Sequence, residues 1–254
     1  YYPFMKIAVT GAAGQIGSRL CEDLARDHEI VRIDIQGVGE PIDVLDLDGL
    51  TRALAGSDTV VHLAGKVAVK ASWDDTHENL IGTYNAFEAA RRAKCNRVIF
   101  ASSNHAVGMY EVDGAPHIYE VASGFLLRTD VPIRPDGLYG VWKTFGESLG
   151  RYYCDEYGLK VACLRIGAIR KDDTPEPKDY SQEATWLKLT DAEKRKRMKS
   201  VWMSQRDLAR LVRAIVASDV PFGIVYGVSD NATRFWDLEA GRTLYGFWPL
   251  DGVK

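Results

Sequence analysis

The segment Thr10-Gly-Ala-Ala-Gly-Gln-Ile-Gly17 constrains the fold of this chain more than any other feature. It follows the apolar run 6–10 and opens a helical pattern that extends from Ile16 to about Arg26. A strand, a glycine-rich turn and a helix in this order are the context that a dinucleotide-binding fingerprint requires. The spacing is G-x-x-G-x-x-G, and the alternative is a glycine-rich turn that holds no ligand.

Each of the three glycines has a distinct task in such a loop. Gly11 permits the tight turn, Gly14 lets the backbone approach a pyrophosphate, and Gly17 allows close packing of helix on strand. The amides at the start of the helix, at Gln15 and Ile16, then face the phosphates with the positive end of the helix dipole. The sequence therefore predicts a dinucleotide site here.

A second apolar run, Glu29–Asp34, ends in an acid about twenty residues beyond the loop. A carboxylate at this point can accept hydrogen bonds from both adenosine ribose hydroxyls and would repel a 2′-phosphate. Arg32 shares a strand face with Asp34 and is predicted to be able to pair with it. Ile35 and Gln36 follow, so no basic side chain comes directly after the acid to bind the 2′-phosphate of NADP. We expect NAD, the alternative for Asp34 being a solvated strand end.

Strands and helices alternate along most of the chain. The predicted strands are Lys6–Thr10, Glu29–Asp34, Pro41–Asp43, Thr59–Ala64, Arg97–Ala101, Lys160–Arg165 and Phe222–Val228. The predicted helices are Ile16–Arg26, Leu47–Leu54, Trp73–Ala93, Leu138–Tyr157, a short one opened by the capping box Thr190–Glu193, and Asp207–Ser218. Such alternation predicts an α/β fold, a Rossmann-type doubly wound parallel sheet with a small C-terminal substrate-side elaboration.

We expect residues 5–254 to form one dinucleotide-binding domain, with substrate-side elements mainly in 104–137, 168–205 and 229–254. Residues 1–4 precede Met5 and are predicted to be a non-native or disordered extension without the character of a targeting segment. Irregular segment 170–178 is predicted to be a loop, and the aromatic tail 234–248 to pack over the substrate side.

Composition excludes several classes of function. A net charge of −3 argues against a general nucleic-acid binder, and no apolar run approaches the roughly 20 residues needed to cross a membrane. The four cysteines have no CxxC or metal-like spacing, so we expect reduced thiols, a cytoplasmic protein and no metal centre.

The segment Tyr139-Gly-Val-Trp-Lys143 contains two candidate catalytic residues. Residues at i and i+4 share a helix face, so the ammonium of Lys143 is expected close to the phenol of Tyr139. A free phenol has a pKa of roughly 10, and a nearby cation lowers that value. Tyr139 is then a candidate base that removes a proton from a substrate hydroxyl. Alone, the pair is also compatible with ordinary helix-surface pairing.

Ser102-Ser-Asn-His105 places two hydroxyls, an amide and an imidazole just beyond a predicted strand. Ser103 is expected to hold the reacting oxygen together with Tyr139, while Asn104 and His105 are candidates for other hydroxyls of a polyhydroxylated ligand. The alternative is a turn closed by side-chain-to-backbone bonds. The basic run Lys194–Lys199 suggests either a phosphate contact or, more simply, a solvated helix face.

TGAAGQIG, VHLAG, the helix around Asn79 and the YxxxK motif together resemble extended short-chain dehydrogenases/reductases of the NAD-dependent epimerase/dehydratase group. More narrowly, FASSNH, RPDGLYG and LRIG are similar to uronate dehydrogenases, which oxidise the anomeric carbon of glucuronate or galacturonate to an aldarolactone. Segments 109–133 and 224–231 are similar to haloarchaeal NAD-dependent glucose-6-phosphate dehydrogenases. The resemblance implies a sugar substrate, a homodimer or higher oligomer, and the catalytic residues Tyr139, Lys143 and Ser103.

The motifs and the resemblance together give the candidate site. The expected cofactor-binding residues are Gly11, Gly14, Gln15, Ile16, Gly17, Asp34, Ile35, Asp43, Val44, Leu63, Ala64, Gly65, Asn79, Ala101, Ser102, Tyr139, Lys143 and Ile166. The expected substrate-binding residues are Ser103, Asn104, His105, Tyr139 and Ala168.

Two departures from the uronate dehydrogenase pattern stand out. Ser181 follows Tyr180 where those enzymes carry a carboxylate-binding arginine, with Lys178, Lys188 or Arg170 as possible substitutes. Trp142 replaces a small serine, either as packing or as a narrowing of the site.

We therefore expect an NAD-dependent oxidoreductase that acts on the C1 hydroxyl of a sugar, first of all a uronic acid. The alternatives are an aldose or glucose-6-phosphate dehydrogenase, a nucleotide-sugar epimerase or dehydratase, and a non-catalytic NAD-sensing regulator.

Overall fold

A six-stranded parallel sheet forms the centre of the protein, in the order β2-β1-β3-β4-β5-β6. The computed structural model describes residues 4–38, 41–67, 71–181 and 183–254. The strands are β1 (Lys6–Thr10), β2 (Glu29–Ile33), β3 (Thr59–His62), β4 (Arg97–Ser103), β5 (Lys160–Ile166) and β6 (Phe222–Gly227). The predicted Rossmann-type fold is confirmed.

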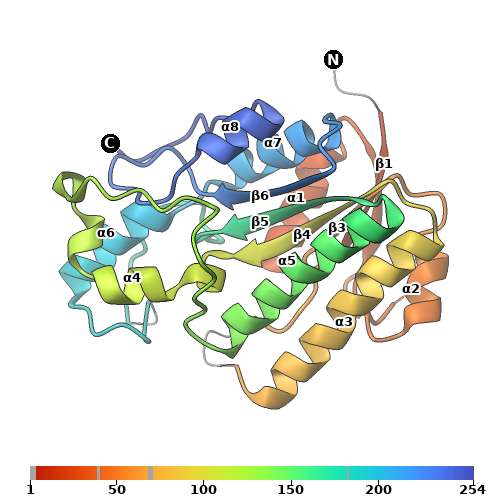
Figure 1. The fold of residues 1–254 in the computed structure, drawn as a ribbon, viewed down its shortest axis with the longest axis horizontal. Coiled ribbons are helices and arrows are strands. Elements are labelled where there is room, and N and C mark those ends of the chain that lie inside the picture. The colour runs from red at the N-terminus through yellow and green to blue at the C-terminus, as the bar shows by residue number, and fades with distance from the viewer. Residues whose placement is uncertain (1–3, 39–40, 68–70, 182) are drawn as a thin grey trace.

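Helices cover both faces of the sheet (Figure 1). They are α1 (Gln15–Leu24), α2 (Leu47–Ala53), α3 (Trp73–Arg92), α4 (Met109–Gly114), α5 (Leu138–Tyr157), α6 (Asp191–Val201), α7 (Gln205–Val216) and α8 (Glu239–Tyr245). Short 3-10 turns η1 (Asn104–Val107), η2 (His117–Tyr119) and η3 (Val121–Ser123) follow β4 and α4.

The two faces follow from the two-residue period of the strands. Ile7 and Val9 of β1 face one apolar cluster with α1 and α7, while Ala8 between them faces the other cluster, with α2, α3 and α5. A third cluster, built around Phe235 and Trp236, joins the segments that follow β4 and β5. In Figure 1, α4 and α6 lie beyond the arrowheads of β4 and β5, at the carboxyl edge of the sheet. Ligands of open parallel sheets bind at this edge.

The structure corrects two sequence expectations. Pro41–Asp43 is not a strand, because Ile42 donates only one ladder-like bond, to the Asp34 carbonyl at 2.9 Å, before Asp46 caps α2. The aromatic tail divides: Phe235 and Trp236 pack on the substrate side, whereas Tyr245 and Phe247 pack with α7 against the sheet.

Residues 1–3 of the expected N-terminal extension lie outside the described residues, and Phe4 is exposed. Within the described ranges, every helix is too short or too polar to pass through a membrane.

Candidate active site

A cavity of about 690 Å³ opens at the carboxyl edge of the sheet. It is lined by the loop after β1, the end of β2, the loop after β3, the end of β4, the start of α5 and the segment after β5. The structure brings together there almost all of the expected site residues: Gly11, Gly14, Gln15, Ile16, Gly17, Asp34, Ile35, Asp43, Val44, Leu63, Ala64, Gly65, Asn79, Ala101, Ser102, Ser103, Tyr139, Lys143, Ile166 and Ala168. Asn104 and His105 are not part of its lining.

The glycine loop is a tight cradle that side chains would fill. Gly11 has a φ of +72°, which favours glycine, and a Cβ there would lie 2.8 Å from the amide nitrogen of Ala64. A Cβ on Gly17 would lie 2.1 Å from the Gly11 carbonyl oxygen. These glycines therefore let the loop close tightly on itself and on the loop after β3, and Gly11, Gly14 and Gly17 all line the cavity, where a pyrophosphate would meet the start of α1.

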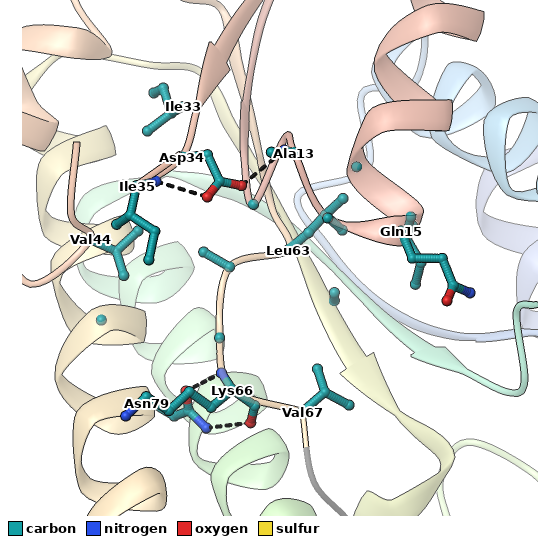
Figure 2. A pocket seen from close by; sticks show the side chains of 18 of the residues that line it. Ala13, Gln15, Ile33, Asp34, Ile35, Val44, Leu63, Lys66, Val67 and Asn79 are labelled. Atoms are coloured by element: carbon teal, nitrogen blue, oxygen red, sulfur yellow. Dashed lines mark hydrogen bonds between the residues drawn. The ribbon is translucent and has the colours of Figure 1, made fainter. Parts of the chain in front are cut away.

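Asp34 ends β2 at the rim of the cavity (Figure 2). One carboxylate oxygen accepts a 2.9 Å bond from the Ala13 amide and the other a 2.8 Å bond from the Ile35 amide. The predicted pairing with Arg32 is wrong, since the Arg32 guanidinium donates instead to the Ala12 carbonyl at 3.1 Å. Asp34 thus ties the glycine loop to β2 while its side chain borders the cavity.

The loop after β3 is fixed from two sides. The side-chain oxygen of Asn79 on α3 accepts a 2.8 Å hydrogen bond from the Lys66 amide, and its side-chain nitrogen donates a 3.0 Å bond to the Lys66 carbonyl, as Figure 2 shows. On the other side, Thr10 accepts a 3.3 Å bond from the Ala64 amide. Gly167, whose place after a predicted strand indicates this shared site, also lines the cavity. Sequence reasoning missed several lining residues next to predicted ones, whose only signal is that neighbourhood: Ala13, Ile33, Gln36, Ile42, Leu45, Lys66, Val67, Glu78, Gly82 and Ile169.

Tyr139 and Lys143 are both buried, and both line the cavity. The Lys143 ammonium donates a 2.6 Å bond to the Ala101 carbonyl, and burial lowers its pKa to about 7. Burial raises the pKa of Tyr139 to about 12, and a hydrogen bond with Ser103 only partly opposes this. The expectation that the lysine depresses the pKa of the phenol is wrong for this structure, because desolvation of the phenolate dominates.

Trp142 is a packing residue. Its ring is 1% exposed, and its indole N–H donates a 2.7 Å bond to Thr83, which joins α5 to α3. A Cβ on Gly65 would lie 2.2 Å from the ring, so the loop after β3 rests on it. The wide side chain is thus accommodated between helices.

The two serines at the end of β4 have different surroundings. The Ser102 hydroxyl donates a 2.6 Å bond to Glu147, which forms a buried 2.8 Å ion pair with Arg165. The Ser103 hydroxyl lies on the Tyr139 side, donates to Asn104 at 3.1 Å and accepts from the His105 amide at 3.3 Å. Both hydroxyls thus use their proton within the protein and keep acceptor capacity, and Ser103 is the one that lies beside Tyr139.

Asn104 and His105 form the buried turn η1 behind Ser103. The His105 Nδ1 atom lies 2.7 Å from a carboxylate oxygen of Asp136. The His105 ring meets the rings of Tyr139 and Trp186 edge to face, with centroids 5.5 and 5.0 Å away. Sequence reasoning singled out neither Asp136 nor Trp186.

Comparison with known proteins agrees with this geometry. Residues 7–170 match the NAD dependent epimerase/dehydratase family. The chain belongs to that family.

Curated relatives resemble the chain over nearly its whole length. An L-arabinose 1-dehydrogenase (NAD(P)(+)) of Haloferax volcanii is 37% identical over 97% of this chain and 96% of the relative. A uronate dehydrogenase of Agrobacterium fabrum is 38% identical, over 98% and 86%. An NAD-dependent glucose-6-phosphate dehydrogenase of Haloferax volcanii is 32% identical, over 96% and 93%. The resemblance to both groups noted in the sequence is confirmed.

A solved structure resembles the chain to a similar degree. The crystal structure of a substituted uronate dehydrogenase from Agrobacterium tumefaciens, complexed with NAD, has a TM-score of 0.78 and 34% identity, and covers 98% of this chain and 86% of that one. The glycine cradle, the acid at the end of β2 and the size of the cavity fit NAD, which is the cofactor of this family member.

The positive charges expected to meet an anionic substrate are mostly paired in this family member. Arg170 forms ion pairs with Glu183 and Asp172, while Lys178 and Lys188 are exposed. On α6, whose capping box at Thr190 and Glu193 is confirmed, the basic residues contact other segments. Lys194 donates to the Tyr180 carbonyl, Lys196 pairs with Glu120, Arg197 with Glu111 and Lys199 with Glu176. These contacts favour the simpler of the two interpretations of the basic run, a structural helix face, over a phosphate contact.

Proposed function

We propose that this family member is an NAD-dependent oxidoreductase that oxidises the C1 hydroxyl of a sugar, in the first place a uronic acid to its aldarolactone. The observation that carries the proposal is the meeting of Tyr139, Lys143 and Ser103 in the lining of the dinucleotide cavity. Three groups able to hold and deprotonate a hydroxyl border the space where a nicotinamide would end.

The three side chains divide the work as follows. The Ser103 hydroxyl turns from Asn104 to donate a hydrogen bond to the hydroxyl oxygen of the sugar, and Tyr139, as phenolate, takes the proton of that sugar hydroxyl. The Lys143 ammonium, four residues away on the same helix face, opposes the cost of burying the phenolate, because a nearby opposite charge favours the ionised form. NAD, when bound, supplies the acceptor for the hydride that leaves C1, so that C1 becomes the carbonyl carbon of a lactone. One proton and one hydride leave the sugar, which closes the balance.

A uronic acid is the leading substrate because of the likeness to uronate dehydrogenases at 38% identity. An uncharged or phosphorylated aldose is the second candidate. Its support is the pairing of Arg170 with Glu183 and the serine at position 181, together with the likeness to an L-arabinose 1-dehydrogenase.

Absorbance of NADH during turnover tests the proposal. The purified protein and NAD are mixed with galacturonate, glucuronate, glucose 6-phosphate, L-arabinose or glucose. Turnover with a uronate supports the leading substrate, and Arg170→Met would then raise the KM for uronate if Glu183 releases that arginine. Turnover restricted to aldoses selects the second candidate.

No NADH from any of the five sugars, with NAD bound, would reject the proposed oxidation. A nucleotide-sugar epimerase or dehydratase would then be sought by product analysis, since such enzymes return the hydride. A regulator that only senses NAD would show no chemistry by either measurement.

We further propose a homodimer formed through α3 and α5. Large apolar side chains are exposed on both helices: Trp73, Ile81 and Tyr84 on α3, Val141 and Tyr152 on α5. Light scattering after gel filtration should give twice the chain mass, and Ile81→Arg with Tyr84→Arg should give a monomer. The four free thiols are consistent with a cytoplasmic protein in which residues 5–254 act as one NAD-binding domain, with substrate-side elements in 104–137, 168–205 and 229–254.

A further inference from the structure

We infer that Asp136 is a positioning residue that fixes the ring of His105 with a proton on Nδ1, so that Nε2 accepts a hydrogen bond from a hydroxyl of the substrate. The use of Nε2 by a sugar rests on the proposed function. The proton on Nδ1 does not, and it can be observed without any substrate.

The contact between the two side chains is short and dry. Nδ1 of His105 lies 2.7 Å from Oδ2 of Asp136, and the side chains are 9% and 3% exposed. An ionised carboxylate only accepts hydrogen bonds, so the Nδ1 atom must donate. In a neutral imidazole the other nitrogen, Nε2, is then left as an acceptor.

Two glycines allow this arrangement. A Cβ on Gly108 would lie 2.3 Å from the carboxyl carbon of Asp136, so only glycine lets the carboxylate reach the histidine. A Cβ on Gly140 would lie 2.3 Å from the His105 carbonyl oxygen. Because Gly140 follows Tyr139 on α5, the same close approach sets the His105 turn against the reacting tyrosine.

The other ring nitrogen of His105, Nε2, remains able to accept a hydrogen bond. In the described ranges, Nε2 has no hydrogen-bond partner, yet it does not belong to the fully buried unpartnered atoms, so solvent reaches it. The ring lies between Tyr139 and Trp186. A sugar whose C1 hydroxyl is held by Tyr139 would bring a neighbouring hydroxyl to this side, and a lone pair rather than an N–H would meet it.

Nitrogen-15 NMR of the labelled protein tests the proton position directly. Protonated and unprotonated imidazole nitrogens have well-separated shifts, and His105→Ala assigns the signal among the five histidines. We expect Nδ1 protonated and Nε2 unprotonated in the wild type at pH 8. Asp136→Leu should yield a mixture of both tautomers. A wild-type His105 protonated mainly on Nε2 would overturn the inference, whatever the enzyme oxidises.

Kinetics on the best sugar test the consequence. Asp136→Leu keeps the branching of the side chain and removes the acceptor, so we expect the KM for the sugar to rise about tenfold or more. In Asp136→Asn, the amide oxygen can still accept from Nδ1, and the KM should stay within about threefold. Asp130→Leu, in the same segment but 67% exposed, is the control and should change neither the KM nor kcat.

A double-mutant cycle separates positioning from general support of the fold. If Asp136 acts through His105, Asp136→Leu should add almost nothing to the KM in a His105→Ala background. An undiminished effect there, or an equal loss of NAD affinity, would show that Asp136 only supports the start of α5 and would overturn the inference. If none of the five sugars is oxidised, the proposed function is rejected and the KM comparison cannot be made. The NMR measurement still decides which nitrogen of His105 carries the proton.

Discussion

The Nζ atom of Lys143 lies 3.5 Å from the centre of the Trp142 ring, so the preceding residue on α5 covers the ammonium with an aromatic face. Such a contact, with one carbonyl acceptor, replaces only part of the water that a free ammonium would hold. The low pKa of Lys143, about 7, follows from this incomplete replacement.

Replacing Lys143 should therefore change stability in a pH-dependent way. The folded-state pKa of about 7 lies below the ordinary 10.5, so the unfolded chain binds the extra proton between these values, and wild-type stability gains as pH rises through this window. Lys143→Met removes the penalty and should be more stable than the wild type by a few kcal/mol, on the order of the shift, at pH 7. Urea unfolding at pH 7 and pH 10 measures this. A stability difference that does not shrink toward pH 10 would contradict the burial argument.

Tyr139→Phe should abolish turnover while leaving cofactor affinity nearly intact. Loss of a general base lowers kcat by roughly 10²–10⁴, whereas the phenol contributes little to holding the dinucleotide. NADH formation gives kcat, and quenching of tryptophan fluorescence gives the Kd for NAD. Tyr152→Phe, on the exposed side of the same helix, is the control. A Tyr139→Phe enzyme with wild-type kcat would exclude Tyr139 as the base.

Gly17→Ala should impair NAD binding, although alanine is ordinarily the better helix former. The new Cβ would fall 2.1 Å from the Gly11 carbonyl oxygen and push the glycine loop away from the phosphates. Gly241→Ala on α8 is a matched control, because its Cβ would have 3.4 Å to the nearest atom and should be neutral or slightly stabilising. We expect at least a tenfold (about 1.4 kcal/mol) loss of NAD affinity for the first variant only. Equal NAD affinities in the two variants, measured by calorimetry, would argue against a phosphate cradle at this turn.

Asp34→Ser should shift the preference from NAD toward NADP. The substitution removes the charge that would repel a 2′-phosphate and leaves Arg32 two residues away, where its guanidinium donates to the Ala12 carbonyl. The ratio of kcat/KM for NAD over NADP should fall by about tenfold or more. Asp48→Asn, exposed on α2, controls for the loss of one negative charge and should keep the wild-type ratio.

Arg165→Met should destabilise the fold strongly. It would leave Glu147 buried without its partner, and breaking a buried pair costs about 3–5 kcal/mol. Arg151→Met removes an ion pair with Asp155 on the solvent-exposed face of α5. This substitution should cost less than about 1 kcal/mol. Urea midpoints of the two variants give the comparison. Similar midpoints would mean that Glu147 finds water or another donor.

The elements with strong periodicity could be predicted from the sequence, and α5 was placed residue for residue. The prediction of a strand at Pro41–Asp43 was wrong, because three residues are too few to show the alternation of apolar and polar side chains that identifies a strand. Among site residues, those in short segments next to a strand end, such as Gly11 and Ser103, follow from topology alone. The partners of Arg197 and His105 could not be predicted, because Glu111 and Asp136 come from segments without periodicity that fold only against the sheet.

The pKa of Tyr139 shows a different limit of sequence reasoning. The i, i+4 spacing places Lys143 on the right face, but it says nothing of how dry that face is. The desolvation of Tyr139 comes from its burial next to the rings of His105 and Trp142, and only the folded structure brings these rings together.

Helix α6 fastens several segments of the substrate side by exposed charges, through Lys196 to Glu120 and Lys199 to Glu176. The sheet that carries the glycine loop is held instead by dry apolar clusters. Salt weakens the first kind of attachment and leaves the second almost untouched. A rise in ionic strength should therefore weaken mainly these exposed ion pairs of α6, while the apolar clusters under the glycine loop and under the substrate side keep their packing.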